Sequence, residues 1–140
     1  MAEYPYKSKI EDAVISIAER FAPPSKPIRE YPLQNKCRAD FCFNIIGGGR
    51  LFIEDDDASR GLSNLVKYWI WCELNANERP VYVIHIIETS SPASIANIEF
   101  IGKKMEKQIE NFHYHMITIP NWSVQVETWL PNLIKVLENI

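Results

Sequence analysis

The sequence predicts an α/β domain in which a mixed central β-sheet is flanked by helices. Two β-rich runs, about Cys37–Ile46 and Leu51–Asp56, flank three glycines, and glycine supplies the positive φ values that a tight hairpin turn needs. The run Val81–Ile87 hardly alternates between apolar and polar residues, which is typical of a strand buried on both faces. Helical periodicity between the later strands indicates crossover connections, so parallel strands join the same sheet as the hairpin.

The remaining elements are predicted from the spacing of their apolar residues and from the breakers at their ends. A first helix is expected from about Ser8 to Phe21, where Pro23 follows. An extended piece around Ile28–Leu33 contains prolines, which confine it to an edge of the sheet. Two further helices are expected, over about Ser59–Leu74 and from Ser91–Pro92 to about Phe112. A short strand is expected over His115–Ile119. The last helix is expected over Trp122–Leu137, with a kink or split at Pro131.

Length and composition indicate a single domain over residues 1–140. Of the 140 residues, 46% are hydrophobic, which is enough for a sizeable core. The net charge of −3 disfavours direct binding to a phosphate backbone, so a nucleic-acid role needs a local basic stripe, a partner or a divalent metal. The first residues lack the apolar stretch of a signal peptide, and no run of about 18 apolar residues occurs. We therefore expect a cytoplasmic protein that does not span a membrane, with reduced cysteines.

The predicted hairpin gathers acidic side chains. Because side chains alternate across a strand, Asp40 lies on one face of the first strand, and Glu54 and Asp56 share a face of the second. A turn centred near Gly48 places Asp40 across from Asp56, and a shift of one residue towards the N-terminus places it across from Glu54. Both registers bring the three carboxylates to one face, where they repel unless they are protonated or bridged by a cation such as Mg²⁺ or Mn²⁺. An odd register would scatter them as solvated groups.

The helix after the acidic strand offers a cation beside this face. The residues of this helix form two stripes along its surface. The apolar stripe is predicted to face the core and consists of Leu62, Leu65, Val66 and Trp69. The second stripe consists of Arg60, Asn64, Lys67 and Trp71. The first turns of this helix would lean over the carboxylates, with Lys67 reaching towards a bound phosphate. An ordinary solvated helix face is the alternative. Trp71, opposite the apolar stripe, is interpreted as a partner contact.

Asp40 and the sequence Glu54-Asp55-Asp56 resemble the motif of the PD-(D/E)XK nuclease superfamily. That family joins an N-terminal helix, a hairpin carrying Asp and then Glu-x-Lys, a helix and a further strand, and the resemblance covers about Ser8–Ile87. Asp40 matches the first acidic position and Glu54 the second. Asp56 stands in the place of the motif lysine, and Lys67 is the candidate for a lysine that has moved to the following helix.

The resemblance implies a restriction-endonuclease-like core and metal-assisted phosphodiester hydrolysis of DNA or RNA. Asp40 and Glu54 would ligate Mg²⁺ or Mn²⁺, and Asp56 would be a third ligand or orient a water. Lys67 would steady the attacking water or the transition-state charge. The family also places a first-helix glutamate near the metal, for which Glu11 and Glu19 are both available.

Two further expectations concern partners and activity. A minimal domain of this type is expected to cut two nucleic-acid strands as a homodimer. The missing motif lysine and the acidic net charge favour an alternative, in which the fold is inactive and acts as a protein-interaction or regulatory module.

Other candidate sites are given structural interpretations. His113 and His115 are spaced to point to one face of a strand, as in some zinc sites, but a surface pair is the preferred interpretation. His85 is interpreted as a core histidine that has hydrogen-bond partners. Gly47–Gly49 is interpreted as a turn, because the Lys-Ser/Thr sequence of a phosphate-binding loop is missing.

Overall fold

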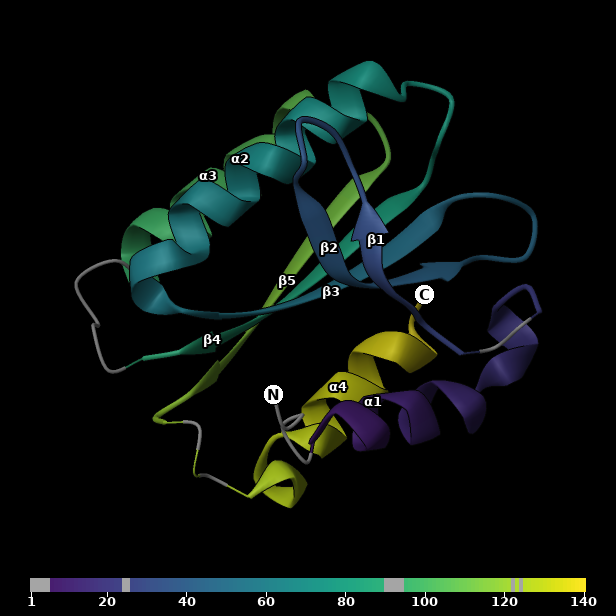
Figure 1. The fold of residues 1–140 in the computed structure, drawn as a ribbon, viewed down its shortest axis with the longest axis vertical. Helices are drawn as coiled ribbons and strands as arrows, with labels where there is room; N and C mark the ends of the chain where they lie inside the picture. Colours follow the sequence, from purple (N-terminus) through teal and green to yellow (C-terminus); the bar gives the residue numbers. More distant parts are fainter. Residues whose placement is uncertain (1–5, 24–25, 90–94, 122, 124) are drawn as a thin grey trace.

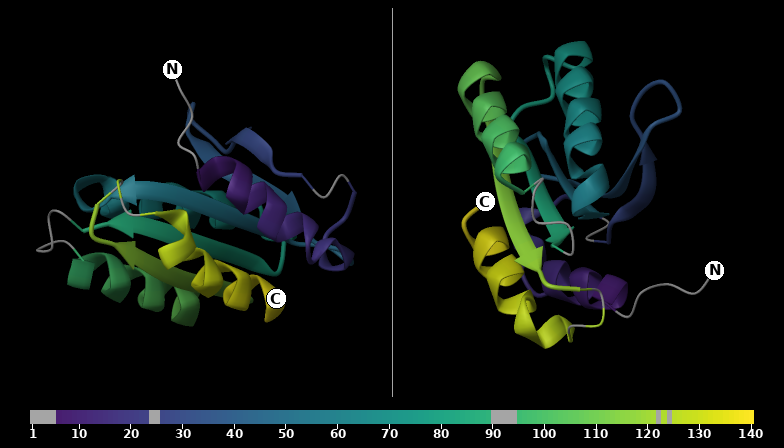
Figure 2. Two further views of the ribbon diagram at one scale, coloured as in Figure 1. Left: turned by 90° about the horizontal axis from the view of Figure 1, so that it is seen from below. Right: turned by 90° about the vertical axis from the view of Figure 1, so that its left-hand side faces the viewer.

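A five-stranded sheet separates two pairs of helices in the computed structural model, which describes residues 6–23, 26–89, 95–121, 123 and 125–140. Helices α2 and α3 cover one face of the sheet, and α1 and α4 cover the other (Figures 1 and 2). This arrangement confirms the predicted α/β fold with a mixed sheet between helices. The helices are α1 (Tyr6–Ile15), α2 (Ala58–Leu74), α3 (Ile95–Gln108) and α4 (Leu130–Glu138), with short 3-10 turns at Ala18–Arg20 and Val126–Thr128.

The strands lie across the sheet in their sequence order. They are β1 (Ile28–Pro32), β2 (Arg38–Asn44), β3 (Arg50–Asp57), β4 (Val81–Glu88) and β5 (Phe112–Ile119). The first three form an antiparallel meander, with β1 at the edge as predicted. Because parallel neighbours need a crossover, α2 connects β3 to β4 and α3 connects β4 to β5.

The turn between β2 and β3 sets the register of the hairpin. Gly47, Gly48 and Gly49 all have positive φ values, of 91°, 114° and 99°, which residues with a side chain rarely adopt. Phe41 lies opposite Ile53 in the resulting register. Of the two even registers that the sequence left open, this is the one in which the turn is shifted towards the N-terminus.

Alternating side chains of the strands supply two apolar layers. On β3, Leu51 and Ile53 pack into the layer beneath α1 and α4, whereas Phe52 packs into the layer beneath α2 and α3. Strand β4 is buried along almost its whole length, as its continuous apolar run predicted. The sheet is therefore covered by helices on both faces.

Helix α2 turns a different stripe to the core from the one predicted. Leu62 and Val66 are 38% and 47% exposed, whereas Trp71 is 4% exposed and packs edge-on against Phe52 at 5.0 Å between ring centroids. The prediction that Trp71 contacts a partner is therefore wrong. The buried stripe is Ala58, Gly61, Leu65, Tyr68, Trp71 and Cys72. Apolar residues occur on most sides of α2, so periodicity did not identify the face that meets the sheet.

Several element ends also differ from the prediction. Helix α1 ends at Ile15, and Phe21, which was expected inside it, instead bridges to Ile45 at the end of the hairpin. Strand β5 begins at Phe112, three residues before its predicted start, because α3 ends at Gln108. Pro131 lies in the first turn of α4, where a missing N–H costs nothing. The predicted start of α3 at Ser91–Pro92 and the residue Trp122 lie outside the described residues.

Two other expectations concern membranes and thiols. None of the helices described is long and apolar enough to cross a membrane. Cys37, Cys42 and Cys72 are free thiols, and the last two are buried. Burial raises the pKa of the Cys42 thiol to about 12 and that of Cys72 to about 11, so both are protonated and unreactive at neutral pH.

Candidate functional site

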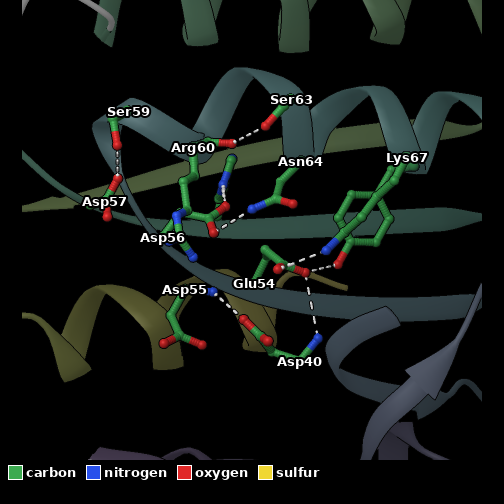
Figure 3. Close-up of polar contacts among 12 residues, drawn as sticks. Asp40, Glu54, Asp55, Asp56, Asp57, Ser59, Arg60, Ser63, Asn64 and Lys67 are labelled. Carbon is green, nitrogen blue, oxygen red and sulfur yellow. Dashed lines mark hydrogen bonds and ion pairs between the residues drawn. The ribbon is translucent and has the colours of Figure 1, made fainter. Parts of the chain in front are cut away.

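Strands β2 and β3 stop pairing at Asp40 and Glu54, and carboxylates replace the ladder hydrogen bonds there (Figure 3). The backbone N–H of Asp40 donates to Glu54 Oε1 at 3.5 Å, and the backbone N–H of Asp55 donates to Asp40 Oδ2 at 2.9 Å. On each strand, a carboxylate thus accepts a hydrogen bond from a backbone N–H of the other strand. This satisfies two donors that the missing pairing would otherwise leave open.

Glu54 is the most enclosed acid of the site. Its side chain is buried beneath α2, where the Tyr68 hydroxyl donates to Oε1 and Lys67 Nζ lies 2.9 Å from Oε2. Burial, and then the negative charge of Asp40, raise the pKa of Glu54 to about 8, although Lys67 opposes the shift. Glu54 therefore retains a proton in part of the population at neutral pH, and the lysine sits where the ionised form needs a counter-charge.

Lys67 bridges the two strands at this point. Besides the ion pair with Glu54, its ammonium donates to the backbone carbonyl of Arg38 on β2 at 2.7 Å. These contacts place the third turn of α2 over the acidic strand. Lys67 is only about one-tenth exposed, so its charge is directed into the site.

Asp56 is held by two polar partners. His85 Nε2 lies 2.6 Å from Asp56 Oδ2, and the amide nitrogen of Asn64 donates to Asp56 Oδ1. His85 Nδ1 lies 2.9 Å from the Tyr114 hydroxyl. A neutral imidazole protonated on Nε2 satisfies both contacts, since it donates to the carboxylate and accepts from the phenol. His85 is 1% exposed, which agrees with its interpretation as a core histidine with partners.

Asp55 is a buried acid that the sequence analysis left out of the site. It points to the opposite face of β3 from Glu54 (Figure 3). There the Tyr6 hydroxyl of α1 donates to its Oδ2. Burial, followed by a hydrogen bond with Asp40 and the charge of Asp40, raises the pKa of Asp55 to about 8. Its Oδ1 is buried without a hydrogen-bond partner among the described residues. The sequence did offer a signal for this burial. Asp55 shares the face of apolar Ile53 by strand alternation, and both faces of β3 are buried.

The structure brings Glu54, Asp56 and Lys67 together beneath α2, but it turns the carboxylate of Asp40 towards Asp55 (Figure 3). The predicted shared face therefore holds for Glu54 and Asp56 and is wrong for Asp40. Asp40 lies beyond the last residues that pair with β3, and the alternation of β2 is broken there, since Ala39 and Phe41 face opposite layers. Its carboxylate accepts from the N–H of Asp55. Within the described ranges, no group of three His, Cys, Asp or Glu side chains is placed to hold a metal ion.

Other predicted site residues lie apart from this cluster. Glu11 forms an ion pair with Arg29, whose Nε lies 3.0 Å from Glu11 Oε1, and Glu19 is exposed in the 3-10 turn after α1. His113 and His115, the predicted surface pair, are both partly exposed on β5, and His113 stacks on Tyr82 at 4.6 Å between ring centroids.

Comparisons of the chain with protein-family models, with curated proteins and with solved structures found no match. The contacts of the described residues are therefore the basis for assigning a function.

Proposed function

We propose that the protein is a small metal-dependent nuclease with a restriction-endonuclease-like core, which hydrolyses phosphodiester bonds of DNA or RNA. The observation that carries the proposal is the position of Lys67. Its ammonium lies 2.9 Å from Glu54 where β2 and β3 separate, and the negative charges of Asp40 and Asp56 act on the same carboxyl. A helix-borne lysine at the acidic strand is what the resemblance to the nuclease superfamily implies. The order α1-β1-β2-β3-α2-β4 supports the same assignment.

The donor chemistry of the site fits Mg²⁺ or Mn²⁺. Asp40, Glu54 and Asp56 offer carboxylate oxygens, the ligands that hard divalent ions prefer. Glu54, whose pKa is raised by burial and by its acidic neighbours, is the group that a divalent cation would stabilise most in its ionised form. When bound, such an ion supplies a water of lowered pKa and neutralises charge on the phosphate.

The acidic residues and Lys67 would each have a separate role in holding the ion and the substrate. Glu54 and Asp40 would hold the ion, which requires the Asp40 carboxylate to leave the N–H of Asp55. Lys67 would exchange its contact with Glu54 for a phosphate oxygen and so stabilise the charge that develops there. Asp56, fixed by His85 and Asn64, would orient a water or act as the third ligand. A homodimer of this domain would cut two strands by symmetry.

A second function is favoured by the hydrogen bonds of the same site. Every carboxylate oxygen of Glu54 and Asp56 already accepts a bond from a protein donor. Each carboxylate therefore helps to hold β2, β3, β4 and α2 together. An inactive fold that serves as a protein-interaction or regulatory module would need the acids only for this purpose.

Cleavage of plasmid DNA, single-stranded DNA and RNA, assayed with Mn²⁺ and with EDTA, tests the first function. The unmodified protein is expected to cleave at least one of these substrates only with the metal, and Glu54→Gln to reduce the rate about 100-fold or more. Glu73→Gln, an exposed carboxyl on α2, is the matched control and should leave the rate unchanged.

Thermal melting with and without millimolar Mn²⁺ separates the two functions. A metal that binds the folded state raises the melting temperature, and the rise should disappear in Glu54→Gln. No cleavage and no shift with Mn²⁺ would favour the interaction module. Cleavage that persists in EDTA or in Glu54→Gln would exclude the proposed site.

A further inference from the structure

Strand β5 is the last strand of the described sheet, and half of its backbone groups point away from β4. The carbonyls of Asn111 and Ile119 accept bonds from the N–H groups of Val81 and Thr89, at the two ends of the β4–β5 pairing. The hydrogen-bonding direction alternates from residue to residue along a strand. The residues whose backbone groups point outward are therefore Phe112, Tyr114, Met116 and Thr118.

Among the described residues, helix α3 bonds the outward backbone groups of this edge at Tyr114. The N–H of Tyr114 donates to Glu106 Oε2 at 2.8 Å, and its carbonyl accepts from Lys103 Nζ at 3.3 Å. In the part of the chain that the structure describes, the outward backbone groups of Met116 and Thr118 have no such partner. Unpaired groups on an edge strand are a ready template for a further strand.

A groove of about 510 Å³ runs along the same edge between α3 and α4. Figure 2 shows β5 between these two helices, which cover opposite faces of the sheet. The groove is lined by Met116 and Thr118 of β5, by Glu99 and Lys103 of α3, and by Asn132 and Lys135 of α4. Residues of β5 line it between residues of the two helices, so it fits one extended segment. A second copy that paired through its own β5 would bring its α3 and α4 against the helices that line the groove, so a single extended segment fits better.

The charges in the groove favour an acidic segment. Lys103 and Lys135 line it together with a single carboxylate, Glu99. Lys103 is already paired with Glu106 at 3.2 Å, whereas exposed Lys135 has no ion pair among the residues described. A carboxylate entering the groove would therefore find its counter-charge on α4.

We propose that this groove binds an extended polypeptide segment that carries an acidic residue and adds to the sheet as a strand beside β5. The backbone groups of Met116 and Thr118 form the main-chain hydrogen bonds, and Lys135 pairs with the acidic side chain. The binding surface is separate from the acidic hairpin, so the proposal does not depend on nuclease activity.

Selection from a displayed library of random nine-residue peptides tests the proposal. Enriched peptides are expected to combine β-branched residues with Asp or Glu and to bind the full chain. Thr118→Pro removes an outward N–H without removing a bond to β4, and the matched control Thr118→Val keeps it. Binding should weaken about tenfold in Thr118→Pro, in line with the loss of a main-chain bond. It should not change in Thr118→Val. Lys135→Glu should weaken the binding of the acidic peptides by a similar factor.

Hydrogen exchange of the unmodified protein gives a readout that does not depend on how well the proline variant folds. The amides of Met116 and Thr118 should exchange fast in the free protein and become protected by a selected peptide. Absence of this protection, or equal binding by a folded Thr118→Pro variant, would overturn the proposal. A homodimer that Thr118→Pro dissociates would also overturn it, because the edge would then belong to a second copy.

Discussion

Glu54 and Asp55 are neighbours on β3 that face opposite layers of the molecule, and the pKa of each is raised to about 8. Burial is the main cause for both, and the charge of Asp40 between them adds to it. Each carboxyl has a tyrosine partner, Tyr68 for Glu54 and Tyr6 for Asp55. Both acids are thus desolvated and are held in place by hydrogen-bond partners. Acids with pKa values perturbed in this way are common at functional sites.

Stability is expected to fall with rising pH because of these two groups. The unfolded chain loses the Glu54 proton near the ordinary value of 4.5, whereas the folded protein holds it to about 8. The contribution to stability is therefore fully present below about 4.5 and is lost as the pH rises to about 8. The free energy of unfolding should decrease by about 1.4 kcal/mol per pH unit for each such proton.

Urea denaturation between pH 5 and pH 8 measures this slope. Glu54→Gln and Asp55→Asn should each flatten it, because each substitution removes one titrating group. Glu73→Gln, which removes an exposed carboxyl of α2, is the control and should keep the slope of the unmodified protein. Equal slopes in all four proteins would show that neither buried acid holds its proton in the folded state.

Helix α3 approaches β5 closely because of one glycine. A Cβ added at Gly102 would overlap the ring of Tyr114, a fully buried side chain whose hydroxyl contacts His85. Neither the ring nor the strand that carries it has room to retreat, since Tyr114 is packed in the layer beneath α2 and α3. The contact between α3 and the sheet therefore depends on the absence of a side chain at this position.

Gly102→Ala should destabilise the protein even though alanine is the better helix former. Alanine gains about 1 kcal/mol of helix propensity, but overpacking of the core costs about 1–3 kcal/mol and displaces Tyr114. Urea denaturation should show a net loss of stability. Asn97→Ala, at an exposed position of α3, is the control, and it should leave stability unchanged or raise it slightly. A stabilised Gly102→Ala variant would mean that α3 lies further from β5 than the structure places it.

The molecule as a whole is acidic, with 15 basic and 18 acidic residues and a net charge of −3. The acidic residues of the candidate site are part of this count, and a negative net charge repels a phosphate backbone. A nucleic-acid substrate would therefore approach an unfavourable field unless a divalent ion offsets it.

Binding to nucleic acid is accordingly expected to require divalent ions. The anisotropy of a labelled DNA duplex should indicate a dissociation constant weaker than about 10⁻⁴ M in EDTA. Addition of Ca²⁺, which takes the same oxygen ligands, should tighten it. Glu54→Gln should remove the effect of Ca²⁺, and Glu73→Gln should retain it. Tight binding in EDTA with a steep salt dependence would instead indicate a basic surface independent of the acidic hairpin.

The sequence by itself determined the order of the elements and much of the hairpin. Three glycines that adopt positive φ, and the period-two alternation of Phe41 and Phe43 against Leu51 and Ile53, favour an even register. The choice between the two even registers, and the exclusion of an odd one, came from the structure. The continuous apolar run of β4 predicted a strand buried on both faces. These features were predictable because they depend on neighbours close in the chain. Because α2 begins directly after β3, its place near the acidic strand was predictable too, whereas the contact of Lys67 with Glu54 was not predicted.

Only the tertiary structure decided where the strands stop pairing and which side chains meet there. Asp40 turns to the N–H of Asp55 because β2 and β3 part beside it, and no local pattern marks that point. Trp71 is buried because α2 turns the face that carries Trp71, and not its aliphatic stripe, towards Phe52 of the sheet. The open edge of β5 exists because no described strand follows it in the sheet. Each of these outcomes depends on contacts between residues distant in the chain, which periodicity does not encode.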